Sequence, residues 1–131
     1  MFVDASAIVA ILLNEPEAEE LLMKLRSAQS PETSALAKFE SALALARAKQ
    51  RDATAALQVI DALLFQSKAK TVDLTEEIGR MAIEAHGQFG KGRHKAKLNM
   101  GDCFAYACAK LHNVPILCKG NDFKLTDIIV A

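Results

Sequence analysis

The sequence carries no net charge and contains no long hydrophobic run. Its 16 basic residues balance its 16 acidic residues, so the overall charge gives no argument for a nucleic-acid or membrane partner, and such an argument needs a local cluster. No apolar stretch approaches the roughly 18 residues of a membrane span, and the first stretch begins at Met1 without a basic leader. Neither secretion nor membrane insertion is indicated, and we expect a cytoplasmic protein.

Cysteine is also scarce. The three cysteines, Cys103, Cys108 and Cys118, are odd in number and form no Cys-x-x-Cys pair. This spacing supports neither a disulfide framework nor a zinc site. We therefore expect a protein in a reducing compartment and interpret Cys103 and Cys108 as packing thiols.

Aromatic residues make up only 5% of the chain, whereas hydrophobic residues as a whole make up 51%. The core must therefore be built mainly from Ala, Leu, Ile and Val. A chain of 131 residues with this composition can bury such a core without disulfides or a structural metal, and we expect one domain spanning residues 1–131. The high apolar content leaves apolar surface for a partner, so we also expect an oligomer.

Short apolar strands alternate with helical patterns along the chain. We expect strands at residues 2–4, 31–33, 71–74 and 114–118, with an edge strand at 128–130. We expect helices at residues 7–13, 15–28, 34–49, 53–66, 75–89 and 101–112, the first capped by Ser6 and the second with Pro16 in its first turn. Parallel strands need crossover helices between them, so the alternation predicts an α/β fold with a central parallel sheet covered on both faces.

Four carboxylates stand where a plain domain would carry apolar residues or simple caps: Asp4, Glu40, Asp102 and Asp122. Asp4 and Asp122 follow the first and fourth expected strands, whose carboxyl ends lie at one edge of a parallel sheet. Glu40 has apolar neighbours on both adjacent helical turns, and Asp102 opens an apolar helix. Buried carboxylates usually become neutral, find a partner or bind a metal. Acids that converge favour a hard divalent cation, Mg²⁺ or Mn²⁺, acting on a phosphate ester.

Each acid taken alone also has a plain structural explanation. Asp4 and Asp102 are well placed to cap the helices that follow them, and Asp122 suits a turn. Asp61 has the same kind of apolar helical neighbours as Glu40. It is therefore the set of four acids, rather than any one of them, that predicts a metal site.

A metal held by such acids would act on a phosphodiester bond. Mg²⁺ is usually bound by one or two carboxylates, with waters and substrate phosphate completing a near-octahedral shell. Such an ion lowers the pKa of a bound water, orients it and neutralises charge on the leaving oxygen. We expect hydrolysis that leaves a 5′-phosphate and a 3′-hydroxyl, and the number of metal ions stays open.

Residues 90–99 lack apolar periodicity and predict a loop, which we call the basic loop. Its basic residues are Lys91, Arg93, His94, Lys95 and Lys97. A solvated surface loop would have the same composition. Directly before the helix that carries Asp102, however, the loop suits a clamp for nucleic-acid phosphates, because Lys and Arg supply affinity for the backbone of any sequence. His94 has no His or Cys partner at ligand spacing, so we expect a solvent-exposed phosphate contact rather than a metal ligand.

The segments that carry these residues are residues 2–7, 34–40, 91–94, 98–106, 118–123 and 126–128. Together they resemble the PIN-domain ribonucleases of the VapC toxin type, and the resemblance spans nearly the whole chain. The segments Gly-Lys-Gly-Arg-His and Asn-x-Gly-Asp-Cys are its most specific parts. The resemblance implies a PIN-like three-layer sandwich, a Mg²⁺-dependent endoribonuclease, a homodimer and a higher assembly with a cognate VapB antitoxin.

The same resemblance implies a role for each acid. Asp4 and Asp102 would hold the metal directly or through water, while Glu40 would complete the pocket and help to position the attacking water. Asp122 would be the fourth acid. Asn121 stands where many relatives carry another acid, which leaves the contribution of Asp122 open. An antitoxin segment with a basic side chain would suit the acidic pocket, because clustered carboxylates attract arginine.

Two other classes of function compete with a nuclease. A phospho-receiver domain is also a small α/β protein with acids and Mg²⁺ at one sheet edge, but its phosphoacceptor Asp follows a central strand, whereas Asp52 lies between two expected helices. A catalytically silent RNA-binding or protein-interaction module would keep the basic loop without needing all four acids. The RNA target stays open, because recognition of structured RNA depends on shape that no motif encodes.

Overall fold

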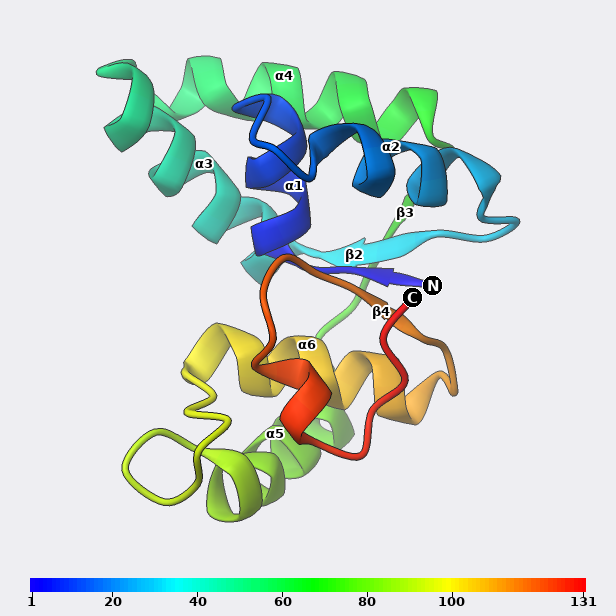
Figure 1. Cartoon of the computed structure of the whole chain (residues 1–131), viewed down its shortest axis with the longest axis vertical. Coiled ribbons are helices and arrows are strands. Elements are labelled where there is room, and N and C mark those ends of the chain that lie inside the picture. The colour runs from blue at the N-terminus through cyan, green and yellow to red at the C-terminus, as the bar shows by residue number, and fades with distance from the viewer.

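The computed structural model describes residues 1–131 and places a four-stranded parallel sheet between two layers of helices (Figure 1). The strands are β1 (Phe2–Val3), β2 (Glu32–Ser34), β3 (Lys70–Val72) and β4 (Ile116–Leu117). Their order in the sheet is β3-β2-β1-β4, and all neighbouring pairs are parallel. The predicted α/β class with a covered parallel sheet is confirmed.

The neighbouring strands β1 and β4 send successive side chains to opposite faces of the sheet, as the strand period of two requires. Phe2 pairs with Ile116, and both belong to one hydrophobic core. Val3 pairs with Leu117, and both belong to the core on the other face. All four side chains are completely buried, which explains why these strands consist of uninterrupted apolar residues.

Four helices cover the Val3 face of the sheet (Figure 1). They are α1 (Ala5–Leu12), α2 (Ala18–Ser27), α3 (Ala35–Lys49) and α4 (Ala53–Gln66). Buried side chains such as Ile8, Leu25 and Ile60 come from three of these helices and join one core with Val3. None of the helices in the molecule combines the length and hydrophobicity that a membrane span requires.

Two helices, α5 (Glu76–Phe89) and α6 (Met100–Leu111), cover the Phe2 face (Figure 1). The buried face of α6 is made largely of small residues, including Ala105, Ala107 and Ala109, which allow the helix to lie close to the strands. A short 3₁₀ helix, η1 (Phe123–Leu125), was not predicted, and it places Phe123 in the same core. The start of α6 therefore lies on the opposite side of the sheet from α1.

Two predicted helix starts were wrong. The first helix begins at Ala5 and is capped by Asp4, whose side chain accepts a hydrogen bond from the backbone N–H of Ser6, so Ser6 is not the cap. The second helix begins at Ala18, which leaves Pro16 before the helix instead of in its first turn. Apolar periodicity locates a helix but not its terminal hydrogen bonds, which decide the boundary.

The predicted edge strand at residues 128–130 was also wrong. Only Val130 makes a parallel bridge, to Ile116, and the flanking residues form no strand. The backbone N–H of Ile116 donates to the carbonyl of Ile129 at 2.8 Å, and that of Ala131 donates to the carbonyl of Ile116 at 2.9 Å. The C-terminal residues thus contact β4 at its start without continuing the sheet.

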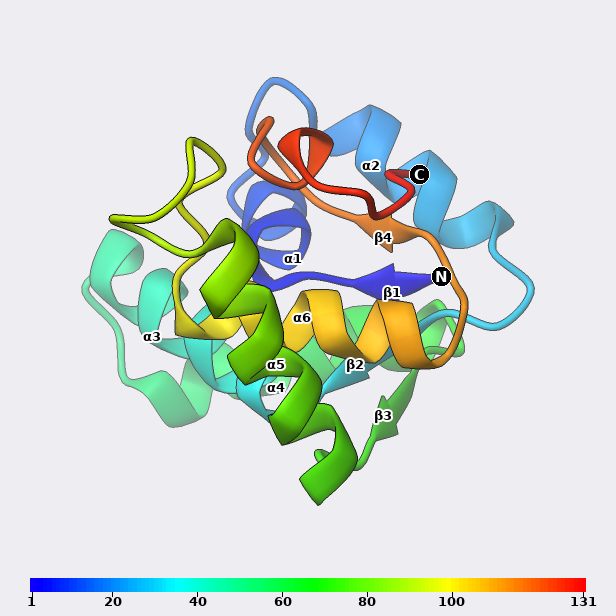
Figure 2. The ribbon, with the colours of Figure 1, turned by 90° about the horizontal axis from the view of Figure 1, so that it is seen from below.

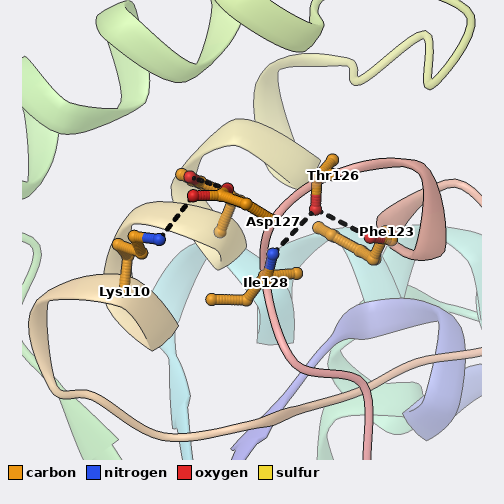
Figure 3. A network of polar contacts seen from close by, with 6 residues as sticks. Lys110, Phe123, Thr126, Asp127 and Ile128 are labelled. Carbon is orange, nitrogen blue, oxygen red and sulfur yellow. Dashed lines mark hydrogen bonds and ion pairs between the residues drawn. The ribbon is translucent and has the colours of Figure 1, made fainter.

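A carboxylate anchors the C-terminal segment to α6 (Figure 3). Asp127 accepts hydrogen bonds from the hydroxyl of Tyr106 at 2.5 Å and from Nζ of Lys110 at 2.6 Å. The bond from Lys110, followed by that from Tyr106, holds the pKa of Asp127 below its usual range. The carboxylate of Asp127 is therefore fully partnered by residues of the protein itself.

The turn before Asp127 is closed by a single hydroxyl (Figure 3). The Oγ1 of Thr126 donates to the carbonyl of Phe123 at 2.7 Å and accepts from the backbone N–H of Ile128 at 3.2 Å. These bonds end η1 and turn the chain toward β4. The segment after β4 is thereby fixed against the helix that carries Asp102.

The three cysteines are buried and free, which agrees with the packing role predicted for Cys103 and Cys108. Burial is the main cause that raises the pKa of Cys108 and of Cys118 to about 12. Neither thiol is therefore suited to act as a nucleophile at neutral pH.

Candidate metal centre

Three of the four predicted acids line one cavity of about 360 Å³. Asp4 comes from the end of β1, Glu40 from α3 and Asp102 from the first turn of α6. Figures 1 and 2 show that the end of β1, the start of α1 and the start of α6 meet at one edge of the sheet. The structure thus brings together carboxylates that lie far apart in the sequence, and their roles stay predictions.

Asp4 is buried and fixed on both sides. Its backbone N–H donates to the carbonyl of Leu117 at 2.9 Å, which holds it beside β4. Its Oδ2 accepts hydrogen bonds from the backbone N–H of Ser6 at 3.0 Å and from the Ser6 hydroxyl at 2.5 Å. Burial raises the pKa of Asp4, and the bonds from Ser6 oppose that rise. Because both bonds use Oδ2, Oδ1 is left for a ligand.

Ser6 has a role that the sequence analysis missed. Its hydroxyl donates to Asp4 and accepts from the backbone N–H of Lys119 at 3.0 Å. Ser6 therefore joins the first acid to the loop that follows β4. The signal in the sequence is the Asp-x-Ser spacing after a strand, because a hydroxyl two residues beyond an Asp can hydrogen-bond back to it.

Glu40 is half-buried and has no hydrogen-bond or ion-pair partner to offset its burial. Burial, followed by the charges of Asp4 and Asp102, raises the pKa of Glu40 to about 7. Its carboxylate lies against Gly101, the residue that precedes Asp102. An acid in this environment is close to half-ionised at neutral pH and carries charge that no side chain neutralises.

Asp102 is both a capping residue and a member of the cavity. It forms a capping box with Asn99: the Asn99 N–H donates to Oδ2 of Asp102, and the Asp102 N–H donates to Oδ1 of Asn99, both at 2.9 Å. Burial raises the pKa of Asp102 to about 6, assisted by the charges of Asp4 and Asp122 and opposed by the bond from Asn99. The capping bond again uses one oxygen only, so capping and metal binding are compatible.

Asp122 lies at the margin of the site. It is exposed, it precedes η1 without a capping bond, and it is not among the residues that line the cavity. Its charge nevertheless contributes to the raised pKa of Asp102. The structure therefore places Asp122 near the three acids that line the cavity, which we call the inner acids (Asp4, Glu40 and Asp102), but does not bring it into their cavity.

Lys119 is the only basic side chain that lines the cavity, and the sequence analysis did not single it out. Its Nζ forms an ion pair with Glu15, which lines the same cavity. The charge of Lys119 is thus taken up by Glu15, and the inner acids remain without a cation. The sequence did offer a signal for Lys119, because it follows a strand whose carboxyl end lies beside the predicted acids.

The donor set fits a hard divalent cation. Burial raises the pKa of Asp4, Glu40 and Asp102, and no basic side chain pairs with them, so a bound cation would relieve unfavourable negative charge. No three of the acidic side chains lie close enough together to be direct ligands of one ion. One or two carboxylates with water-mediated contacts to the rest is the usual arrangement for Mg²⁺, and Asp4 and Asp102 each have an oxygen free for it.

The ends of the basic loop are held together by backbone pairing, and the lysine and arginine side chains between them are exposed to solvent. Gly90 and Leu98 form a parallel bridge, and Ala96 and Leu98 are completely buried. The exposed basic residues of the loop are Lys91, Arg93, Lys95 and Lys97. Figure 2 shows the loop at the end of the molecule where α1 and α6 begin. Its charges thus lie at the same end of the molecule as the acidic cavity.

His94 does not have the solvent-exposed position that we expected. The side chain is half-buried, its ring packs edge-on against Phe89 with the centroids 5.3 Å apart, and its Nδ1 accepts a hydrogen bond from the N–H of Ala96 at 3.1 Å. This contact shapes the loop and leaves Nε2 as the ring atom that can reach a phosphate.

Comparison with known proteins decides the family. The PIN domain family matches residues 1–129. The chain is 36% identical over 128 residues to Ribonuclease VapC from Mycolicibacterium smegmatis, which covers 98% of this chain and 97% of that protein. It is 39% identical over 139 residues to a VapC ribonuclease from Rhizobium meliloti, with 97% and 98% covered. The chain belongs to the VapC-type PIN domains.

This membership confirms the resemblance inferred from the motifs. Among solved structures, a toxin–antitoxin complex from Klebsiella pneumoniae contains a chain with a TM-score of 0.69 to this VapC-type PIN domain. The match covers 99% of this chain and 95% of that chain at 15% sequence identity. At this low identity the likeness supports the PIN-like three-layer fold alone.

Proposed function

We propose that this chain, acting as one PIN domain over residues 1–131, is a divalent-metal-dependent endoribonuclease and the toxin of a VapBC-type toxin–antitoxin system. The observation that carries the proposal is the cavity in which Asp4, Glu40 and Asp102 gather without a neutralising cation. The names of its relatives, which are VapC ribonucleases, agree with this chemistry. The products would be a 5′-phosphate and a 3′-hydroxyl.

The three inner acids divide the work. Asp4 and Asp102 hold the metal directly or through water, each with the oxygen that its helix cap leaves free. Bound there, Mg²⁺ or Mn²⁺ supplies a water of lowered pKa and neutralises charge on the leaving oxygen. Glu40, whose pKa is raised to about 7, orients the attacking water and accepts its proton near neutral pH. Asp122 adds negative charge at the margin of the site.

The basic loop would hold the RNA backbone. Lys91, Arg93 and Lys95 are exposed, so their charges are free to contact phosphates while the scissile bond lies at the acids. His94 would contribute through Nε2, since its Nδ1 is occupied by Ala96. Such contacts give affinity for any RNA, and the choice of target would come from the shape of the RNA.

A VapB-type antitoxin and a second copy of the chain are the proposed protein partners, and the cytoplasm is the proposed location. Exposed apolar side chains support a protein partner, because large solvent-exposed apolar groups often mark interaction surfaces. Ile83 and Met100, which are 74% and 66% exposed, line an apolar groove of about 770 Å³ between α5 and α6. A homodimer or a toxin–antitoxin assembly would remove such groups from water.

Cleavage of a panel of structured RNAs tests the activity. Wild type, Asp4→Asn and Asp102→Asn are compared with Mg²⁺ and with EDTA, and circular dichroism checks that each variant is folded. We expect wild type to cut only with metal and both variants to be inactive, because each loses a charged metal ligand. Cutting in EDTA, or full activity in both variants, would contradict the proposal. RNA binding without cutting under every metal condition would instead identify a silent module.

A further inference from the structure

Gly101 occupies an unusual place beside the cavity. It is a buried residue in the first turn of α6, between the capping residue Asn99 and Asp102. A Cβ atom built on Gly101 would overlap both carboxylate oxygens of Glu40. The Glu40 carboxylate therefore occupies the space that any other residue at position 101 would fill with its own side chain.

The backbone does not require glycine at this position. Gly92 and Gly120 have positive φ angles, which favour glycine, but Gly101 does not. Alanine is the better helix former, so an alanine at position 101 would suit α6 if the space were free. The feature that distinguishes glycine here is the absence of a side chain next to Glu40.

The group that an alanine at position 101 would displace is the flexible end of a long side chain and not backbone. Glu40 makes no hydrogen bond or ion pair that holds its carboxylate elsewhere. Its position is thus set by the space between α3 and α6. A methyl group at position 101 would move the carboxylate away from the first turn of α6 while the two helices kept their places.

We propose that Gly101 is a positioning residue for the reaction. Because Gly101 has no side chain, it leaves open the space in which the Glu40 carboxylate lies beside Asp102. The inference rests on the proposed metal-dependent activity for its chemical meaning and on the packing of α3 against α6 for its geometry. A larger residue at position 101 would displace the Glu40 carboxylate without replacing any acidic residue, and the protein should remain folded.

The first experiment measures Mn²⁺ binding by isothermal titration calorimetry, together with the thermal unfolding temperature, for Gly101→Ala. Gly87→Ala is the matched control, because Gly87 is also helical, is exposed on α5 and has no heavy atom within 4 Å of a Cβ built there. We expect Gly101→Ala to weaken Mn²⁺ binding about tenfold or more, as removal of a supporting residue does in metal sites, with an unchanged or higher unfolding temperature. The control should bind Mn²⁺ as wild type does. Equal binding by Gly101→Ala and wild type would overturn the inference.

A rescue experiment separates positioning from a general structural role. Glu40→Asp shortens the side chain by one methylene, so in the wild-type background it withdraws the carboxylate and should weaken Mn²⁺ binding. In the Gly101→Ala background the shorter side chain leaves room for the methyl group and should restore part of the binding. If Glu40→Asp weakens Mn²⁺ binding in the wild-type background and strengthens it in the Gly101→Ala background, the two positions are directly coupled. Equal losses in both backgrounds would contradict it.

A crystal structure of metal-free Gly101→Ala distinguishes failure of this inference from failure of the proposed function. The inference requires a displaced Glu40 carboxylate with α3 and α6 in place, whether or not the protein binds metal. An unmoved carboxylate with a shifted α6 would overturn it. Absence of Mn²⁺ binding by wild type, combined with the displaced carboxylate in the variant, would refute the metal-dependent function and leave the packing relation intact.

Discussion

Two carboxylate environments in this protein differ in a way that separates structure from function. Asp127 accepts hydrogen bonds from Lys110 and Tyr106, and these partners lower its pKa. Glu40 has no such partner, and burial with neighbouring acids raises its pKa to about 7. The first carboxylate is neutralised by the fold, whereas the second can be neutralised only by something that binds. The comparison teaches that an acid left without a partner is the better indicator of a site.

The largest expected difference between the two environments is catalytic. Glu40→Gln keeps the size of the side chain but removes the group that accepts the proton, so RNA cleavage should fall by about a hundredfold or more. Asp127→Asn should keep cleavage close to wild type, because Asp127 lies outside the cavity. It should instead lower the free energy of unfolding by about 1 kcal/mol, since its charged hydrogen bonds are weakened. Cleavage rates and urea denaturation of both variants measure these two effects. A similar loss of cleavage activity in Glu40→Gln and Asp127→Asn would contradict the prediction.

The pH dependence of stability should have opposite signs at the two places. The pKa of Glu40 rises from 4.5 to about 7 on folding, so its ionisation disfavours the folded state. In EDTA, Glu40→Gln and wild type should be equally stable near pH 4, and the variant should gain stability over wild type as the pH rises from about 4.5 to about 7. The gain should reach about 2 kcal/mol, because solvent screening at the half-buried Glu40 reduces the effect of the full pKa shift. Mg²⁺ should shrink this gap, because the ion stabilises the ionised wild-type site.

Asp127 supplies the opposite slope as an internal control. Its pKa falls below the ordinary value of 3.8 on folding, so its contribution is present above that pH and is lost as the pH falls through the lower folded-state pKa. The deficit of Asp127→Asn should therefore be largest at neutral pH and vanish in acid. A Glu40→Gln gap that is the same at every pH would show that the Glu40 carboxylate is not perturbed by folding.

The smallest expected effect concerns the basic loop. Arg93→Ala with Lys95→Ala should weaken RNA binding and reduce the slope of log affinity against log salt by about 0.7 for each phosphate that the variant no longer binds. Lys68→Ala with Lys70→Ala is the matched control, because these residues lie before and at the start of β3, away from the carboxyl edge of the sheet. Filter binding of inactive Asp4→Asn protein across a salt series measures both slopes. An unchanged salt slope in the loop variant would contradict the hypothesis that the basic loop binds RNA phosphates.

The sequence was sufficient to predict the architecture and to single out the three acids that share the cavity, whose roles stay predictions. Alternating strands and helices require a parallel sheet, and the carboxyl edge of that sheet is where Asp4 must lie. Glu40 and Asp102 were found because their apolar surroundings are visible in the local sequence. Helix starts were predicted less well, since the capping bond from Ser6 to Asp4 depends on side-chain direction and not on hydrophobic period.

Contacts between distant segments could not be predicted from the local pattern. The bond between Ser6 and Lys119 joins residues that are 113 positions apart, and the burial of His94 depends on its packing against Phe89. The space beside Gly101 that the Glu40 carboxylate occupies depends on the distance between α3 and α6. Such features follow from the assembled layers, which no single stretch of sequence specifies.

The shared use of Asp4 and Asp102 as caps has a mechanical consequence. Asp4 is bonded to the start of α1 and Asp102 to the start of α6, and these helices belong to cores on opposite faces of the sheet. If Asp4 and Asp102 hold one ion, directly or through water as proposed, that ion would link the two helical layers at the carboxyl ends of the strands. Loading the centre would then stiffen the whole sandwich, and losing the ion would loosen both halves together.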